Sequence, residues 1–316
     1  MEYRKLGEYG VKVSEISLGS WLTYGNYVER DKAVQTIHKA YELGINSFDT
    51  ANVYAQGEAE KVVGEALKDF DRDSYVLATK VFWPMGEGPN DRGLSRKHIY
   101  EQFHKSLRRL DHDYVDIYYA HRFDSSVPLE ETLKTFDDLL RQGKVLYLGV
   151  SEWTAAQIVE GLRVQDKHLL SHLVVNQPIY NLFNRYIENS VVSTVKENGM
   201  GLIVFSPLAQ GLLTGKYRKG EPIPEDSRAA DSNVNSSLKE MLTEDNLEKI
   251  ENLIDIAEEL NITMPQLALA WILNQPGISS ALIGASKPEQ VEENVKAVEV
   301  DLSDNILDRI ENIMKD

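Results

Sequence analysis

Two short segments of the chain carry a carboxylate, a phenol and an amine at the ends of apolar runs. Asp49 and Tyr54 lie in the segment Ser47–Tyr54, and Lys80 follows the next apolar run. An isolated tyrosine titrates near pH ~10, so it needs a neighbouring cation to act as an acid closer to neutrality. Lys80 offers that cation, and Asp49 offers a counter-charge that keeps Lys80 oriented. The three residues are a candidate acid catalyst, although Asp, Tyr and Lys at strand ends are more often structural.

Short apolar runs alternate with segments of helical period along almost the whole chain. Strands that are apolar throughout and separated by helices predict a parallel sheet covered by helices. No GxGxxG sequence occurs, which argues against a Rossmann fold. The predicted strands are Glu15–Leu18, Ser47–Thr50, Tyr75–Thr79, Val115–Ala120, Leu146–Val150, Leu173–Asn176, Leu202–Phe205 and Ser280–Ile283.

Eight strand–helix units in 316 residues predict an α/β fold, a (β/α)₈ TIM barrel formed by one domain over residues 1–316. The residues before Glu15 predict a short N-terminal hairpin that caps the bottom of the barrel. Apolar residues from Leu302 to Ile313 predict an extra C-terminal helix on the outside. The Gly- and Pro-containing stretch from Leu208 to about Thr243 predicts a long functional loop.

Further polar side chains follow the later predicted strands. His121 comes after the fourth strand, Ser151 after the fifth, and Ser206 after the seventh. A single histidine at such a place is more often structural than catalytic. In a barrel, however, the carboxyl ends of all strands meet at one rim, so Asp49, Tyr54, Lys80 and His121 would face each other there. Their convergence favours the catalytic interpretation.

The last strand–helix unit contains Ser286, Lys287 and Pro288 at the predicted start of a helix. Proline in the first helical turn leaves backbone N–H groups free at a helix N-terminus, where a phosphate binds well. Ser286 adds a hydroxyl and Lys287 a cation. The alternative is a capped helix with an exposed lysine, and the residues alone favour neither.

Composition excludes several classes of function. The formal net charge of −16 argues against nucleic-acid binding, which depends on Lys and Arg contacts to phosphate. The chain has no cysteine, so disulfides and thiolate chemistry are excluded. No run is apolar enough for a signal peptide or a membrane span, which predicts a cytoplasmic protein without membrane insertion. A metal hydrolase would need a His/Asp ligand cluster that the motifs lack, so no metal site is expected.

The sequence resembles the aldo-keto reductase family over essentially its whole length. The segments that carry the resemblance are SFDTANVY, ATKV, YAHR, GVSEW, VVNQPIYN, SPLAQGLLTGKY and GASKPEQVEEN. They are most similar to the branch that contains bacterial general aldo-keto reductases and the β subunits of voltage-gated potassium channels. The resemblance implies a TIM barrel that binds NADPH without a Rossmann domain and reduces aldehydes or ketones.

The resemblance also implies roles for individual residues. Tyr54 would be the proton donor, Lys80 would lower its pKa, Asp49 would orient Lys80, and His121 would place the substrate carbonyl. The cofactor contacts would be Ser20, Trp21, Asp49, Ser151, Asn176, Gln177, Phe205, Ser206, Pro207, Leu208, Gln210, Gly211, Lys216, Arg228, Gly284, Ser286, Lys287, Gln290, Glu293 and Asn294. Gln290 departs from the family, where an arginine is common near the adenine.

Two functions stay open at this point. The first is an NADPH-dependent reductase of small carbonyl compounds. The alternative is an NADPH-binding, redox-sensing subunit that regulates a membrane channel with weak or no turnover. Channel β subunits usually have Asn at the position of His121, and no long inactivating segment precedes the barrel, so the sequence favours the reductase. A homo-oligomer is compatible with either. Trp21, Tyr24, Trp83, Phe123 and Trp153 are expected to line the substrate pocket.

Overall fold

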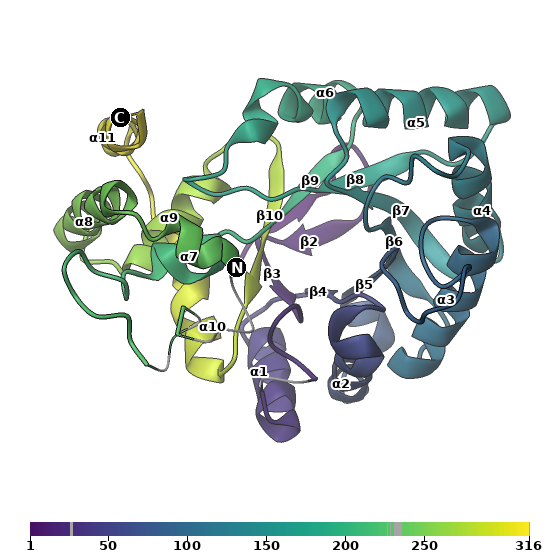
Figure 1. The fold of residues 1–316 in the computed structure, drawn as a ribbon, viewed down its shortest axis with the longest axis horizontal. Coiled ribbons are helices and arrows are strands. Elements are labelled where there is room, and N and C mark those ends of the chain that lie inside the picture. Colours follow the sequence, from purple (N-terminus) through teal and green to yellow (C-terminus); the bar gives the residue numbers. More distant parts are fainter. Residues whose placement is uncertain (26–27, 226, 228, 231–235, 316) are drawn as a thin grey trace.

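Eight parallel strands close into a barrel in the order β10-β3-β4-β5-β6-β7-β8-β9 (Figure 1). The computed structural model describes residues 1–25, 28–225, 227, 229–230 and 236–315. The barrel strands are β3 (Ile16–Gly19), β4 (Ser47–Asp49), β5 (Val76–Val81), β6 (Val115–Ala120), β7 (Val145–Ser151), β8 (Leu173–Gln177), β9 (Gly201–Phe205) and β10 (Ile278–Gly284). Each overlaps the strand predicted from the sequence, so the predicted TIM barrel is confirmed.

Helices surround the barrel as an outer layer (Figure 1). They are α1 (Arg30–Glu42), α2 (Glu58–Leu67), α3 (Arg96–Leu110), α4 (Leu129–Arg141), α5 (Ala155–His168), α6 (Val191–Glu197), α7 (Ser236–Met241), α8 (Glu244–Glu259), α9 (Met264–Leu273), α10 (Pro288–Val295) and α11 (Asp304–Lys315). Side-chain caps fix several helix starts; the capping box of Thr263 and Gln266 opens α9.

Alternation along the strands divides the core into two parts. On β5, Val76 and Ala78 belong to a cluster inside the barrel, whereas Leu77 and Val81 pack against the helices. Successive side chains of a strand point to opposite faces, so Lys80 shares the inner face of Ala78 and Thr79 faces the helix layer. The charged Lys80 therefore enters the barrel interior at the carboxyl end of β5.

The predicted hairpin is present at the opposite end of the barrel. Strands β1 (Tyr3–Lys5) and β2 (Lys12–Ser14) pair antiparallel. Leu6 and Val13 of this hairpin are fully buried in the inner cluster. The hairpin thus fills the bottom of the barrel with apolar side chains.

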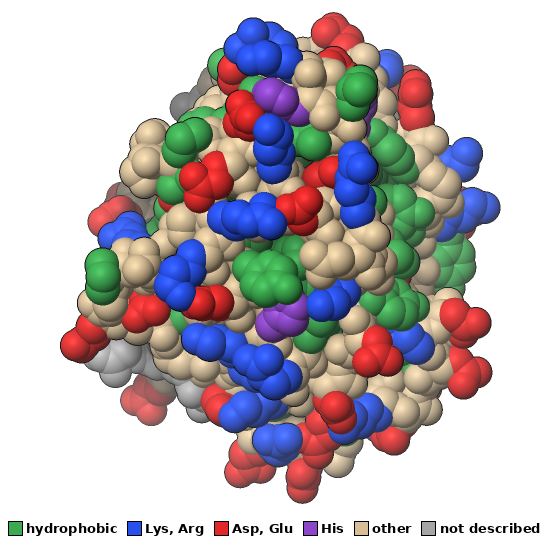
Figure 2. Space-filling model, turned by 90° about the vertical axis from the view of Figure 1, so that its right-hand side faces the viewer, with side chains coloured by type: hydrophobic (Ala, Val, Ile, Leu, Met, Phe, Trp, Pro, Cys, Tyr) green, Lys and Arg blue, Asp and Glu red, His purple; other side chains and the backbone are tan. Residues whose placement is uncertain are grey.

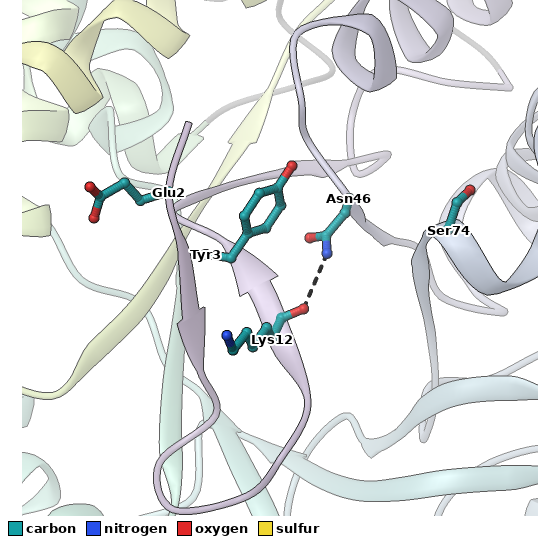
Figure 3. Close-up of a pocket in the computed structure, with 5 residues that line it drawn as sticks. All are labelled: Glu2, Tyr3, Lys12, Asn46 and Ser74. Atoms are coloured by element: carbon teal, nitrogen blue, oxygen red, sulfur yellow. Dashed lines mark hydrogen bonds between the residues drawn. The ribbon is translucent and has the colours of Figure 1, made fainter.

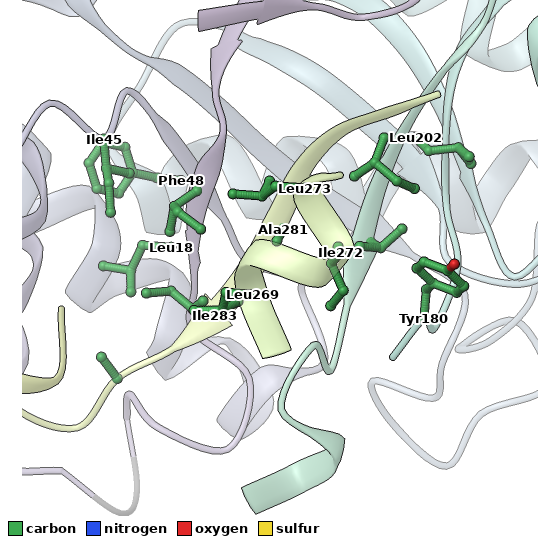
Figure 4. Packing of buried hydrophobic residues seen from close by; sticks show 14 of the residues in the cluster. Leu18, Ile45, Phe48, Tyr180, Leu202, Leu269, Ile272, Leu273, Ala281 and Ile283 are labelled. Carbon is green, nitrogen blue, oxygen red and sulfur yellow. The ribbon is translucent and has the colours of Figure 1, made fainter. Parts of the chain in front are cut away.

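The connection from β9 to β10 is long and contains the most apolar helix of the fold. Every residue of α9 is buried, and Leu269 and Ile272 lie close to Ala281 and Ile283 of β10 (Figure 4). The predicted C-terminal helix is α11, which packs on α8 rather than on the barrel strands. Glu311 of α11 accepts hydrogen bonds from Arg185 and Trp271. The outer layer is therefore two helices deep on this side.

The face shown in Figure 2 carries acidic and basic side chains interspersed with apolar ones. Ion pairs such as Lys134 with Glu130 and Arg163 with Glu160 connect neighbouring turns of the surface helices. Pairs of this kind are exposed and screened by solvent, so they contribute little to stability. The charged helix faces are solvated surfaces, as their composition indicates.

Candidate active site

Lys80 is a fully buried cation at the carboxyl end of β5. Its ammonium donates to Asp49 at the end of β4 and, at 3.0 Å, to the Thr50 carbonyl. Aromatic rings lie on two further sides, with the ring centroids of Tyr54 and Tyr119 at 5.2 and 5.7 Å from Nζ. A buried charge is tolerated only when it is paired and hydrogen-bonded. Asp49 supplies the pairing that keeps Lys80 in the barrel mouth.

Asp49 is held from its other side by Gln177. The Gln177 Nε2 donates to Asp49 Oδ2 at 2.9 Å, from the end of β8. The backbone of Asp49 is fixed as well, because its carbonyl accepts from Ser20 N at 3.0 Å. The two carboxylate oxygens of Asp49 therefore accept hydrogen bonds from two different side chains, Lys80 and Gln177. Gln177 was predicted as a cofactor contact; it lines the cavity, and its amide nitrogen binds the Asp49 carboxylate in this structure.

Tyr54 begins an irregular turn between β4 and α2. Ala55 and Gln56 have φ of 47° and 55°, and Gly57 has φ of 94°. A side chain on Gly57 would also meet Arg109, because a Cβ there would lie 2.6 Å from its Cδ. The turn projects Tyr54 over the barrel mouth, where its Oη lies 3.5 Å from Nε2 of His121. Four residues from three strand ends and one turn therefore meet, as the sequence predicted.

The pKa of Tyr54 departs from the sequence-based expectation. Burial, followed by the negative charge of Asp49, raises the pKa of Tyr54 well above its usual value, and Arg122 opposes this. Lys80 is not among the charges that shift this pKa, so the expected lowering is absent; burial also lowers the pKa of Lys80 itself, which Asp49 opposes. Tyr54 consequently stays protonated through the neutral range, as a proton donor must before it meets its acceptor.

His121 is buried at the end of β6 and its imidazole stays neutral. Burial, together with Lys80 and Arg122, holds the pKa of His121 well below its usual value. Its Nδ1 has no hydrogen-bond partner among the described residues. The ring faces Tyr54 at 5.7 Å and Trp83 at 6.3 Å between centroids, both edge to face. A neutral imidazole here can donate or accept a hydrogen bond at the reacting carbonyl.

A cavity of about 950 Å³ opens over these residues at the carboxyl ends of the strands. Its size lies within the usual range for small-molecule sites. It extends from Trp83 and Arg122 beside the catalytic candidates to the first turns of α10. The predicted cofactor residues that line it are Ser20, Trp21, Asp49, Ser151, Gln177, Phe205, Ser206, Pro207, Leu208, Gln210, Gly211, Lys216, Gly284, Ser286, Gln290, Glu293 and Asn294.

Two of the predicted cofactor residues that the structure describes are not in the lining. Asn176 lies behind it, fully buried, with Nδ2 donating to the Trp153 carbonyl at 3.3 Å and Oδ1 unpartnered. Lys287 is exposed at the N-cap of α10 and outside the cavity wall. Arg228 lies outside the described residues. Lys287 therefore does not line the α10 end of the described cavity as the motif implied.

The start of α10 is also less open than expected. Gln290 Oε1 accepts from the backbone N–H of Ser286 at 2.8 Å and from its hydroxyl at 3.1 Å. One of the N–H groups expected to be free for a phosphate is thus already satisfied within the chain. A ligand phosphate at this turn would compete with the Gln290 side chain.

Unpartnered hydroxyl groups elsewhere in the wall fit a polar ligand. Ser20, Thr23 and Ser227 line the cavity, and the side-chain oxygen of each is buried without a hydrogen-bond partner among the described residues. Buried hydroxyls in folded proteins are normally bonded, so such groups call for a ligand or ordered water. Lys216 adds a cation with no carboxylate partner in the described parts of the chain. This wall fits the phosphates and hydroxyls of a dinucleotide.

The cavity lining also includes aromatic side chains. Trp21, Tyr24 and Trp83 line the cavity as expected. Phe123 and Trp153 do not: Trp153 is fully buried, and the two rings pack on each other at 5.0 Å. Sequence reasoning missed Arg122 in this wall, although the strand-end segment YAHR contained it next to His121.

A second, shallower hollow of about 570 Å³ lies at the hairpin end (Figure 3). It is lined by Glu2, Tyr3, Lys12, Asn46 and Ser74. Asn46 fixes the hairpin, since Nδ2 donates to the Lys12 carbonyl at 3.1 Å and Oδ1 accepts from Ser14 N at 2.7 Å. These contacts have a structural role and assemble no catalytic set.

Comparison with known proteins agrees with this geometry. Residues 15–315 match the model of the aldo/keto reductase family. The chain belongs to the aldo-keto reductase family. A similar relative is a "Probable voltage-gated potassium channel subunit beta" of Arabidopsis thaliana, 43% identical over all of this chain and 97% of that protein. Another is a "Putative voltage-gated potassium channel subunit beta" of Schizosaccharomyces pombe, 44% identical over 99% of this chain and 93% of its own length.

Membership makes this protein an oxidoreductase of the aldo-keto reductase type. A similar rice protein, 43% identical over the full chain, carries the same channel-subunit name as the Arabidopsis relative. Within the described part of the chain, no helix is both long and apolar enough to cross a membrane. The described residues also contain no group of three or more metal-binding side chains.

Proposed function

We propose that this protein is an NADPH-dependent reductase that converts aldehydes and ketones to alcohols, with Tyr54 as the proton donor. The observation that carries the proposal is the meeting of Tyr54, His121 and the Lys80–Asp49 pair at the base of one large cavity. The unpartnered hydroxyls of Ser20, Thr23 and Ser227 support a dinucleotide in the rest of that cavity.

When bound, the cofactor supplies the hydride that reduces the carbonyl carbon. The protein supplies the proton that the carbonyl oxygen takes up. Tyr54 Oη donates its proton to the carbonyl oxygen as negative charge develops there, so the bond to hydrogen forms as the C=O double bond is lost. The basicity of an alkoxide far exceeds that of a phenolate, which drives the transfer even though the pKa of Tyr54 is raised.

The neighbouring residues hold Tyr54 and the substrate in place. His121 Nε2, 3.5 Å from Tyr54 Oη, is near enough to hydrogen-bond the same carbonyl oxygen. Lys80 Nζ lies 5.2 Å from the centroid of the Tyr54 ring and offsets part of the negative charge of Asp49 that the phenol would otherwise meet. Asp49 and Gln177 fix Lys80 through the bonds described above. The chemistry thus rests on groups that are positioned before the substrate arrives.

The test is a panel of aliphatic and aromatic aldehydes and ketones assayed with NADPH and NADH in parallel. Consumption of NADPH with stoichiometric alcohol formation is expected, with NADH giving lower kcat/KM. Tight NADPH binding with no alcohol formed from any carbonyl compound would contradict the reductase proposal.

The relatives are named as voltage-gated potassium channel β subunits, which favours a second candidate, a subunit that regulates a membrane channel. In this candidate the redox state of a bound NADPH would control the regulation. The two candidates differ in turnover and in partner. A channel subunit would change the gating of a co-expressed potassium channel in membrane patches. It would do so in the reduced-cofactor state and not in the oxidised one, with or without measurable carbonyl reduction.

A further inference from the structure

Arg122 is a cation in the cavity wall that has no carboxylate partner among the described residues. It follows His121 directly at the end of β6 and lines the cavity with Tyr54 and Trp83. Most other arginines of the fold whose side chains approach buried regions are paired, as Arg72 is with Asp116 and Arg109 is with Glu60. An unpaired guanidinium beside a reacting centre is therefore unusual in this protein.

The contacts of Arg122 leave one edge of its guanidinium available. Nη1 donates to the His121 carbonyl at 2.5 Å and to Ser151 Oγ at 3.4 Å. Nε and Nη2 have no protein acceptor in the described part of the chain. These two nitrogens form the edge that binds a carboxylate through two parallel hydrogen bonds. The Nη1 contacts hold the side chain in place, so little conformational entropy is lost when a ligand binds.

Arg122 also lies beside an aromatic ring. Its guanidinium carbon lies 5.6 Å from the centroid of the Trp83 ring, and Trp83 is edge to face with His121. Trp21, Val28 and Val53 line the same cavity. The charge of Arg122 is felt at the reacting groups, since it contributes to the pKa shifts of Tyr54 and His121. An anion bound to Arg122 would therefore lie within the substrate region.

We propose that the substrate side of this cavity selects carbonyl compounds that also carry a carboxylate, with Arg122 binding the carboxylate and the indole of Trp83 covering the body of the molecule. The inference rests on the proposed reductase function for the reacting group, and on Arg122 for the charged one. The protein as a whole has a net charge of −16, which disfavours anions in general. A local unpaired cation is what such a substrate requires.

The test compares 4-carboxybenzaldehyde with the neutral 4-formylbenzamide, which has nearly the same shape. Values of kcat/KM are measured with NADPH for the parent protein, Arg122→Met and Arg122→Lys. The ratio of carboxylate to amide is compared between proteins, which cancels the different intrinsic reactivity of the two aldehydes. Arg163→Met removes an equal charge from the exposed surface of α5 and serves as the matched control.

In Arg122→Met the ratio is expected to fall about ten- to a hundredfold, because a charge-assisted hydrogen bond has that effect on affinity. Arg122→Lys, which keeps the charge, should retain a higher ratio than Arg122→Met, and Arg163→Met should keep the parent's ratio. Equal losses for both aldehydes in Arg122→Met would overturn the proposal. So would a rise in the Kd for NADPH that accounts for the whole effect, since it would make Arg122 a cofactor contact.

A binding measurement separates this inference from the reductase proposal. If neither aldehyde is reduced, the reductase function fails, and calorimetry with benzoate and benzamide on the NADPH-loaded protein then decides the inference. Benzoate is expected to bind more tightly than benzamide to the parent and to lose that advantage in Arg122→Met. Equal binding of the two ligands to the parent would overturn carboxylate selection.

Discussion

Glu60, a carboxylate with no exposed surface, binds Arg109 and Thr79 at the same time. Its Oε2 lies 2.5 Å from Arg109 Nε, and its Oε1 accepts from the Thr79 hydroxyl at 2.6 Å. Thr79 precedes Lys80 on β5, and Glu60 lies in the first turn of α2, just after the Tyr54 turn. This contact connects the strand that carries the buried amine to the helix that supports the phenol.

Replacing Glu60 with alanine should lower the free energy of unfolding by about 3–5 kcal/mol, because it leaves Arg109 without its buried partner. Urea unfolding followed by circular dichroism measures this. Glu160→Ala breaks an exposed pair with Arg163 and should leave the free energy of unfolding almost unchanged. The double variant Glu60→Leu with Arg109→Met should recover part of the loss. A Glu60→Ala protein as stable as the control would contradict the importance of this pair.

Tyr54→Phe should reduce kcat for aldehyde reduction by roughly 10²–10⁴, the usual effect of a general acid. The hydroxyl acts when charge develops on the carbonyl oxygen, so the Kd for NADPH should change little. Stopped-flow reduction and fluorescence titration measure the two quantities. Tyr41→Phe is a matched control, since the Tyr41 hydroxyl bonds Ser74 on the outer layer. Near-parental kcat in Tyr54→Phe would refute the proton-donor role.

Lys80→Met should cost both activity and stability, because Asp49 then remains as a buried charge without its cation. The unpaired carboxylate would raise the pKa of Tyr54 further and weaken it as an acid. The double variant Lys80→Met with Asp49→Asn removes both charges. It should regain stability relative to the single variant without regaining turnover. Recovery of turnover along with stability would show that the ammonium has no part in the reaction.

Stability should fall as the pH is lowered below about 6.5, the unperturbed value for histidine. The pKa of His121 is held well below that value in the folded state, so only the unfolded chain gains a proton there. Each such group contributes up to about 1.4 kcal/mol per pH unit between the two pKa values. His98 and His112 have lowered pKa values and contribute in the same direction. Denaturant midpoints from pH 7.5 to 5 should show a smaller slope in His121→Gln; identical slopes would contradict burial of the neutral imidazole.

Lys287→Ala tests the preference for NADPH over NADH. The two cofactors differ only in the 2′-phosphate, so a residue that binds this group affects one Kd and not the other. Lys287 is exposed, which limits the expected weakening of NADPH binding to about tenfold. Lys296 lies at the other end of the same helical segment, so Lys296→Ala serves as the control and should change neither Kd. Equal changes for NADPH and NADH in Lys287→Ala would assign it to a part common to both cofactors.

The strands and the rim were predictable because the barrel imposes a strong local pattern. Each strand is a continuous apolar run, and Asp49, Lys80 and His121 follow such runs directly. The details that the sequence did not predict depend on contacts between distant segments. Gln177 donates a hydrogen bond to Asp49, which lies 128 positions earlier in the sequence, and no local sequence pattern predicts that hydrogen bond. The closure of Gln290 onto Ser286 and the unpaired state of Arg122 likewise depend on which acceptors the fold brings near.

The closure of the barrel has a consequence for how the protein is made. Ser280 on β10 donates its hydroxyl to the Glu15 carbonyl, 265 positions away, and β3 pairs with β10 along its whole length. During translation the first barrel strand therefore emerges with one of its two neighbours still unsynthesised. At roughly 5–20 residues per second, that edge stays unpaired for tens of seconds. A ribosome-bound chain would be open to chaperones throughout this interval, and the barrel would close only when the last strand leaves the exit tunnel.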